Sequence, residues 1–258
     1  MNYYLFYAVD LYDKTKITEE KVNCPKMNAN KWYTYFIPIQ IIFSMFVACS
    51  SDHAGQYENY INQAIKYENE KKYEKAITSI NLSLKIDSTK SFPYVLRGKI
   101  LRLMHSDSTA ILDFSKAIQL NPKNISAYFN KAISLSLLDN DDSAIFYFNQ
   151  AIKMKEFGDF ILEKKNSNFP DLESQNDISL SSIRFHRGLS LYSKKNDSLA
   201  IEDFKYSLKY GYNKSESQFY IGVILLQTGD NKNGCLYLKD ALQNGNKDAY
   251  EYLRKFCT

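Results

Sequence analysis

The chain has 258 residues, and its 33 lysine and arginine residues nearly balance 29 aspartate and glutamate residues, for a formal net charge of +4. A nucleic-acid-binding surface needs a concentrated basic face, so nucleic acid is not an expected partner. The histidines His53, His105 and His186 lack paired metal-ligand spacing, and no phosphate-binding glycine loop occurs, so no enzyme activity, catalytic residue, metal or cofactor is expected.

An apolar run, WYTYFIPIQIIFSMFV, occupies residues 32–47. A membrane-spanning helix needs roughly 20 apolar residues, whereas this run is shorter and is interrupted by Pro38 and Gln40. A removed secretory segment of about 7 to 15 apolar residues behind a positive charge fits better, and Lys31 supplies that charge. The run therefore favours export with removal of the leader.

The four residues Phe46-Val47-Ala48-Cys49 resemble the lipobox of bacterial lipoproteins. In that motif a small residue precedes the cysteine that is diacylated and becomes the mature N-terminus; Phe46 departs from the usual leucine. The resemblance implies cleavage before Cys49 and lipid attachment to its thiol. The alternative is an uncleaved helix or a buried core strand.

Residues 1–26 contain four acidic residues, unlike the short basic start of an export signal. We therefore interpret residues 1–26 as a mis-annotated extension, 27–48 as the signal peptide and 49–56 as a lipidated tether. Cleavage would leave 210 residues (258 minus 48), enough for one domain or one repeat array. Ser50 follows the cysteine where an aspartate would indicate inner-membrane retention in some bacteria, so the outer membrane is favoured.

A 34-residue pattern recurs in five windows, which begin at residues 57, 91, 125, 181 and 215. Small residues occupy the eighth position (Ala64, Gly98, Ala132, Gly188 and Gly222) and the twentieth (Ala76, Ala110, Ala144, Ala200 and Gly234). A large apolar residue occupies the twenty-fourth (Ile80, Phe114, Phe148, Phe204 and Leu238). In period and residue pattern the chain resembles tetratricopeptide repeat (TPR) proteins.

That resemblance implies an all-α, right-handed superhelical TPR solenoid of antiparallel helix pairs with a C-terminal capping helix. We expect repeats 1–3 over residues 57–156 and repeats 4–5 over 181–248. Residues 157–180 would be an insertion, either a loop on a binding face or a helix extension without a binding role.

Aspartates recur at the seventeenth position of three windows, as Asp107, Asp141 and Asp197. Aspartate side chains cap helix N-termini by accepting bonds from first-turn N–H groups, so we predict an N-cap before each second helix. A metal site is disfavoured because these residues lie a whole repeat apart.

The resemblance also predicts a concave groove lined by positions 2, 5, 9, 12 and 13 of each first helix. Its candidate partner-binding residues are Phe129, Phe185, Phe219, Tyr192, Leu137 and Leu226, with Lys99 and Arg102 as a basic spot. The lysine–asparagine pair with which some family members grip a C-terminal carboxylate is absent. Such an apolar stripe suits a helix or an extended segment of a protein, although these residues could instead pack inside the superhelix.

Residues 249–258 predict a capping helix, which the exposed end of a solenoid needs. Cys235 and Cys257 would lie at the same end of two antiparallel helices, so we consider them a candidate disulfide. Two separate buried thiols are the alternative.

Together these features predict a membrane-anchored lipoprotein that binds an unidentified protein or peptide, in a role such as cell-envelope assembly. The alternative is a cell-surface lipoprotein module for nutrient capture or host contact.

Overall fold

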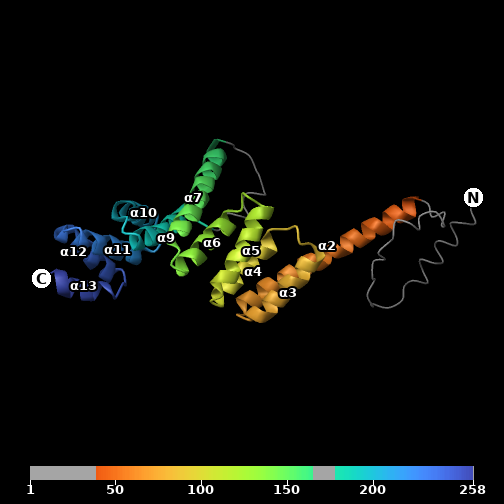
Figure 1. The fold of residues 1–258 in the computed structure, drawn as a ribbon, viewed down its shortest axis with the longest axis horizontal. Coiled ribbons are helices and arrows are strands. Elements are labelled where there is room, and N and C mark those ends of the chain that lie inside the picture. Colours follow the sequence, from red (N-terminus) through yellow and green to blue (C-terminus); the bar gives the residue numbers. More distant parts are fainter. Residues whose placement is uncertain (1–38, 165–177, 258) are drawn as a thin grey trace, which may run out of the picture. The chain divides into compact units, whose positions relative to one another are not determined.

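The computed structural model describes residues 39–164 and 178–257, with side chains from residue 54 onward except for 158–177 (Figure 1). Contacts divide the chain into two units, Met1–Gly55 and Gln56–Thr258. The predicted extension, the first part of the predicted signal peptide and residues 165–177 of the predicted insertion lie outside the described residues.

The described residues form eleven helices and no strand. In chain order they are α2 (Ile39–Asn69), α3 (Tyr73–Ile86), α4 (Phe92–Leu103), α5 (Asp107–Leu120), α6 (Ile125–Leu137), α7 (Asp141–Lys164), α9 (Leu180–Ser193), α10 (Asp197–Lys209), α11 (Lys214–Gln227), α12 (Asn231–Gln243) and α13 (Ala249–Phe256). Residues 49–56, predicted to be a tether, are part of helix α2.

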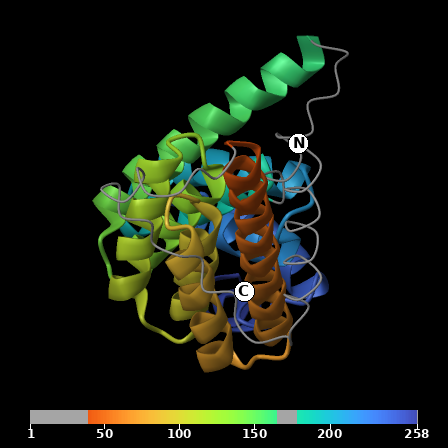
Figure 2. The ribbon, with the colours of Figure 1, turned by 90° about the vertical axis from the view of Figure 1, so that its right-hand side faces the viewer.

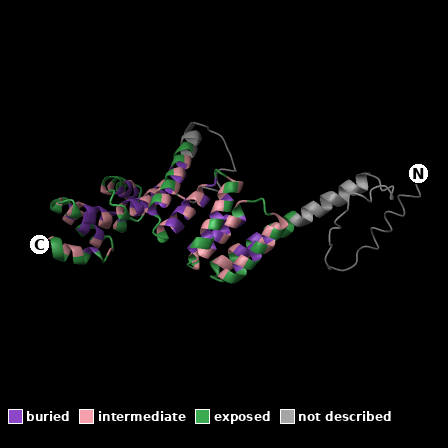
Figure 3. Cartoon of the chain, viewed as in Figure 1, coloured by how far each residue is buried: buried purple, intermediate pink, exposed green. Residues whose placement is uncertain are grey.

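The second unit is a succession of helix pairs that follows the predicted repeats. The pairs are α4 with α5, α6 with α7, α9 with α10 and α11 with α12, and each pair packs on the next through α5–α6, α7–α9 and α10–α11 contacts. The end of α2 pairs with α3 through a buried cluster that includes Ala64, Ala76 and Ile80. Figure 3 shows the buried residues along the faces where these helices meet.

The core of each pair depends on the small residues predicted from the sequence. Phe114, Phe148 and Phe204 have no exposed surface. A Cβ atom placed on Gly98 would lie 2.6 Å from Cε1 of Phe114, so in that pair only glycine lets the ring approach the opposite backbone this closely. The close crossing of the two helices is therefore set by the small residue at position 8.

Each turn between the two helices of a repeat contains one residue in the left-handed region. It is the fifteenth of its window and is Lys71, His105, Asp139, Lys195 or Gly229, with φ between 56° and 90°. This conformation at the residue after a helix lets the next N–H groups bond the last carbonyls, and His105 N donates to Arg102 O. Asp107, Asp141 and Asp197 follow two residues later.

The prediction that these three aspartates are N-caps is wrong. Each is the first residue of its helix, one position beyond the cap. Asp141 instead accepts a hydrogen bond from Ser136 Oγ (3.1 Å). An acidic side chain in the first turn still interacts favourably with the positive end of the helix dipole.

The α7 helix is 24 residues long, against 14 in α5, and runs into the predicted insertion. In two perpendicular views its end extends beyond the neighbouring helices (Figures 1 and 2). The described start of the insertion is thus a helix extension, and the array resumes at α9.

Candidate functional site

The first helices of the repeats lie along one side of the second unit, which we call the first-helix side. Contacts join α4 to α6, α6 to α9, and α11 to α13. This is the side on which the sequence predicts a partner-binding groove.

Two of the three phenylalanines predicted to line the groove are core residues. Phe129 is 9% exposed and Phe185 is 4% exposed. Their rings pack against Phe148 and Phe204, with ring centroids 6.0 Å and 5.7 Å apart. These two rings thus follow the alternative that the sequence left open, packing inside the superhelix, because position 5 faces the second helix of its own repeat. Phe219 is only partly buried.

The remaining apolar residues of the predicted groove are more accessible. Leu137 is 60% exposed, whereas Tyr192 and Leu226 are partly buried. Tyr192 packs edge-on against Tyr220, and its hydroxyl accepts a hydrogen bond from Gln227 Nε2 (3.2 Å). These contacts link the first helices of the fourth and fifth repeats.

The predicted basic spot lies partly buried on the same side. Arg102 Nη2 donates to Asn130 Oδ1 (3.2 Å), while its buried Nε has no partner among the described residues. Burial lowers the pKa of Arg102, and the Asp107 carboxylate partly offsets this effect. Burial, together with the charge of Arg102, also lowers the pKa of His186 to about 4, so this imidazole is neutral at neutral pH.

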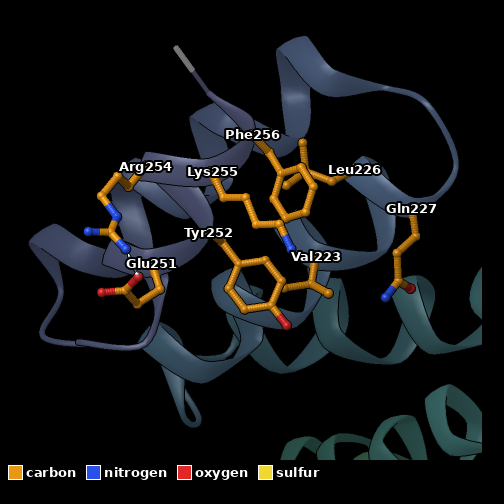
Figure 4. Close-up of a pocket in the computed structure, with 8 residues that line it drawn as sticks. All are labelled: Val223, Leu226, Gln227, Glu251, Tyr252, Arg254, Lys255 and Phe256. Atoms are coloured by element: carbon orange, nitrogen blue, oxygen red, sulfur yellow. Dashed lines mark hydrogen bonds and ion pairs between the residues drawn. The ribbon is translucent and has the colours of Figure 1, made fainter.

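A pocket of about 590 Å³ lies between α11 and the capping helix α13. Its lining residues are Val223, Leu226 and Gln227 from α11, and Glu251, Tyr252, Arg254, Lys255 and Phe256 from α13 (Figure 4). The α11 residues occupy positions 9, 12 and 13 of the fifth repeat, which are predicted groove positions. Leu226 is thus the one candidate groove residue that lines this pocket.

A disulfide bond joins the C-terminal end of the capping helix α13 to helix α12. Cys235 of α12 and Cys257 are bonded, with Sγ atoms 1.98 Å and Cα atoms 5.6 Å apart. Since α13 supplies five of the eight lining residues, this bond fixes one wall of the pocket relative to the last repeat.

Sequence reasoning missed the pocket because it treated α13 only as a cap. The available signal was the spacing of Tyr252, Lys255 and Phe256, which places two rings and an ammonium group on one helix face. The described side chains include no cluster of three or more His, Cys, Asp or Glu residues that could hold a metal ion.

A family model described as tetratricopeptide repeat matches residues 125–157, which comprise α6 and most of α7. The crystal structure of MamA is similar to this chain, with a TM-score of 0.58 and 18% sequence identity. The match covers 79% of this chain and 96% of MamA. YrrB, described as a TPR protein with an unusual peptide-binding site, is 18% identical with a TM-score of 0.59, over 76% and 90%.

The chain folds as a tetratricopeptide-repeat solenoid. PilW, described as a widely conserved type IV pilus biogenesis factor, is also similar to this solenoid, at 17% identity and a TM-score of 0.57 over 77% of this chain and 91% of PilW. A comparison with curated proteins finds no matching sequence. None of the helices in the described part of the TPR chain has the length and apolar character needed to cross a membrane.

Proposed function

We propose that this chain is a membrane-anchored lipoprotein without enzyme activity, whose TPR solenoid binds a segment of a partner protein on its first-helix side. The observation that carries the binding role is the open apolar pocket at predicted groove positions of the fifth repeat. Pockets lined mainly by apolar side chains with a few polar groups are the usual form of a ligand site.

The other features of the first-helix side support the same role. Leu137 offers exposed apolar surface, and the Lys99 ammonium forms no ion pair within the described residues. YrrB has a peptide-binding site according to its description, which makes a peptide or protein segment a reasonable class of ligand for the same fold.

The anchor in this proposal is a lipid on Cys49, with residues 27–48 removed as a signal peptide and the mature protein held at the outer membrane. The lipobox resemblance supports this, and two or more acyl chains give stable membrane attachment. The similarity to a pilus biogenesis factor supports a role in cell-envelope assembly.

The binding role is tested by pull-down from detergent-solubilised membranes. The variant Lys99→Glu/Leu137→Asp changes two accessible side chains on the first-helix side without touching the buried phenylalanines. Leu112→Asp is the matched control, because Leu112 is 68% exposed on the second helix α5. We expect a partner that is retained by the wild type and the control but lost from the double variant.

Equal recovery of every protein by all three chains would contradict the proposal. Protease treatment of intact cells then identifies the side of the membrane: removal of the chain would indicate a cell-surface module for nutrient capture or host contact, and protection would support an envelope-assembly role.

A further inference from the structure

The pocket between α11 and α13 has an apolar centre and an unequal distribution of charge. In Figure 4 the rings of Tyr252 and Phe256 face Val223 and Leu226, and Lys255 lies between the two rings. Glu251 and Arg254 also line the pocket, farther from the two rings, and are paired with each other at 3.0 Å.

Lys255 lies at the centre of the pocket, and its charge is not paired with a carboxylate of the described residues. Its Nζ lies 5.0 Å from the centroid of the Phe256 ring, and no carboxylate of the described residues lies within ion-pair distance. An ammonium group without a countercharge is paired favourably by a carboxylate, because charge-assisted hydrogen bonds are the stronger ones. The charge therefore favours an acidic ligand over a basic one.

Two polar groups next to the apolar centre suit a peptide backbone. Gln227 uses its Nε2 to donate to Tyr192, which leaves its carbonyl oxygen able to accept a backbone N–H. The Tyr252 hydroxyl also has no hydrogen bond within the described part of the chain. A hydrocarbon chain could use neither group, whereas an extended polypeptide offers a donor and an acceptor at each residue.

We propose that this pocket binds a large apolar side chain that is flanked by a carboxylate in an extended, acidic segment of a partner protein. The apolar side chain lies between the two rings and α11, and the carboxylate pairs with Lys255. This inference rests on the proposed function and adds the chemistry of the recognised segment.

The experiment titrates the purified full chain into the fluorescein-labelled peptide Ser-Gly-Asp-Phe-Asp-Gly-Ser and measures fluorescence anisotropy. The comparison peptides replace both aspartates by lysine, or the phenylalanine by serine. Lys255→Glu and Lys255→Met are the test variants, and both should fold because Lys255 is exposed. Lys239→Glu is the matched control, since Lys239 is exposed on α12 and does not line the pocket.

We expect binding of the Asp-Phe-Asp peptide that weakens about tenfold with Lys255→Glu, less with Lys255→Met, and by less than about twofold with Lys239→Glu. Both comparison peptides should bind at least about tenfold more weakly to the wild type. If the Asp-Phe-Asp peptide does not bind at protein concentrations up to about 1 mM, the inference is overturned.

Equal affinity for the lysine peptide, or no effect of Lys255→Glu, would overturn it as well. Binding of decanoate, which lacks a peptide backbone, with no binding of the peptide would assign the pocket to a free amphiphilic anion instead. These outcomes differ from failure of the proposed function, because the pull-down tests Lys99 and Leu137, which lie outside this pocket.

Discussion

At the scale of single residues, two pairs of a partly buried arginine and a buried aspartate join the two helices of repeats 2 and 4. Arg187 Nε and Nη2 donate to both carboxylate oxygens of Asp203 at 2.7 Å, and Nη1 donates to Asn149 of the preceding repeat at 2.6 Å. Arg97 bonds Asp113 and Asn81 at equivalent positions of the second and first repeats. Each arginine thus joins its own repeat to the one before it.

Replacing only one partner of the Arg187–Asp203 pair should destabilise the fold. Burial raises the pKa of Asp203, and Arg187 opposes this rise by stabilising the carboxylate. Replacing the arginine in Arg187→Leu leaves the buried Asp203 carboxylate without its hydrogen-bonded countercharge, so we expect a loss of about 3–5 kcal/mol in the free energy of unfolding. Urea unfolding monitored by circular dichroism measures this loss.

Two further variants control for this result. Lys194→Ala removes an exposed pair with Asp142 and should cost less than about 1 kcal/mol. Arg187→Leu/Asp203→Leu removes both charges and should be more stable than the single variant. A single variant as stable as Lys194→Ala would show that Asp203 is not dependent on Arg187.

His186 should make the stability of the fold depend on pH. Its imidazole packs among Phe129, Phe148 and Phe185, and its pKa is lowered from 6.5 to about 4 by burial and by Arg102. Below pH 6.5 the unfolded chain takes up a proton that the folded chain does not. The stability from neutral His186 is therefore complete above pH 6.5 and is lost as the pH falls toward 4, by on the order of 3 kcal/mol.

This prediction is measured by urea unfolding of wild type and His186→Phe at pH 7 and pH 4.5. The variant should lose less stability on acidification, because it has no imidazole to protonate in the unfolded state. His105→Asn is the control, since His105 is an exposed turn residue with φ of 56° that asparagine also adopts. A similar loss in all three chains would assign the pH dependence to other groups.

At the scale of helix pairs, the spacing of small residues predicted the structure well because each one has a geometric task. Gly222 lies where α11 crosses α12, and an added Cβ would meet Leu238 Cγ at 2.8 Å and the Gly234 carbonyl oxygen at 3.0 Å. At Gly188 the atoms that a Cβ would meet belong to the ring of Phe204, at 3.0 Å or more. A ring can tilt, whereas a backbone carbonyl in a helix cannot.

We therefore expect Gly222→Ala to destabilise the fold by about 1–3 kcal/mol. Gly188→Ala should change stability by less than about 1 kcal/mol, because the higher helix propensity of alanine offsets a small ring shift. Ala132 already faces Phe148 in the third repeat, which shows that this arrangement is compatible with the fold. Thermal unfolding of both variants compares them directly, and the reverse order would contradict the argument.

The capping helix should depend on the Cys235–Cys257 disulfide. The bond closes a separation of 22 residues, and a loop of that size contributes about 3 kcal/mol in the chain-entropy model. A reductant should lower the unfolding temperature of the wild type and speed amide exchange in α13, with no effect on Cys257→Ser. Two free thiols in the unreduced protein, detected by intact mass after alkylation, would show that the bond is not formed.

At the scale of the whole molecule, the sequence predicted the repeat architecture but not which surfaces remain open. The small-residue spacing was sufficient for the helix pairs because core packing repeats with the same period as the sequence. Exposure of Phe129 and Phe185 could not be predicted, since it depends on how closely neighbouring helices approach. The pocket likewise depends on where α13 lies against α11, although its aromatic spacing was visible. The Arg97–Asp113 and Arg187–Asp203 pairs were visible as a shared separation of 16 residues.

The proposed lipid anchor predicts a specific dependence on Cys49. In a bacterial host, wild-type protein should incorporate labelled palmitate and enter the detergent phase of a Triton X-114 extract. Cys49→Ser should do neither, because the thiol carries the acyl group, whereas Cys257→Ser should behave as wild type in both assays. A precursor mass that includes residues 1–26 would contradict the interpretation of those residues as a mis-annotated extension. Labelling of Cys49→Ser would contradict the anchor.

The side-chain hydrogen bonds and ion pairs that join neighbouring repeats are unequally distributed along the array. One arginine–asparagine bond, Arg97–Asn81, joins repeats 1 and 2, and one, Arg102–Asn130, joins repeats 2 and 3. Repeats 3 and 4 are joined by four side-chain bonds: Arg184–Glu156, Arg187–Asn149, Ser190–Ser136 and Lys194–Asp142. In a solenoid, where each repeat contacts only its neighbours, stability is a sum of repeat and interface contributions. A pulling force applied along the array would therefore open the joint between repeats 2 and 3 before the joint between repeats 3 and 4.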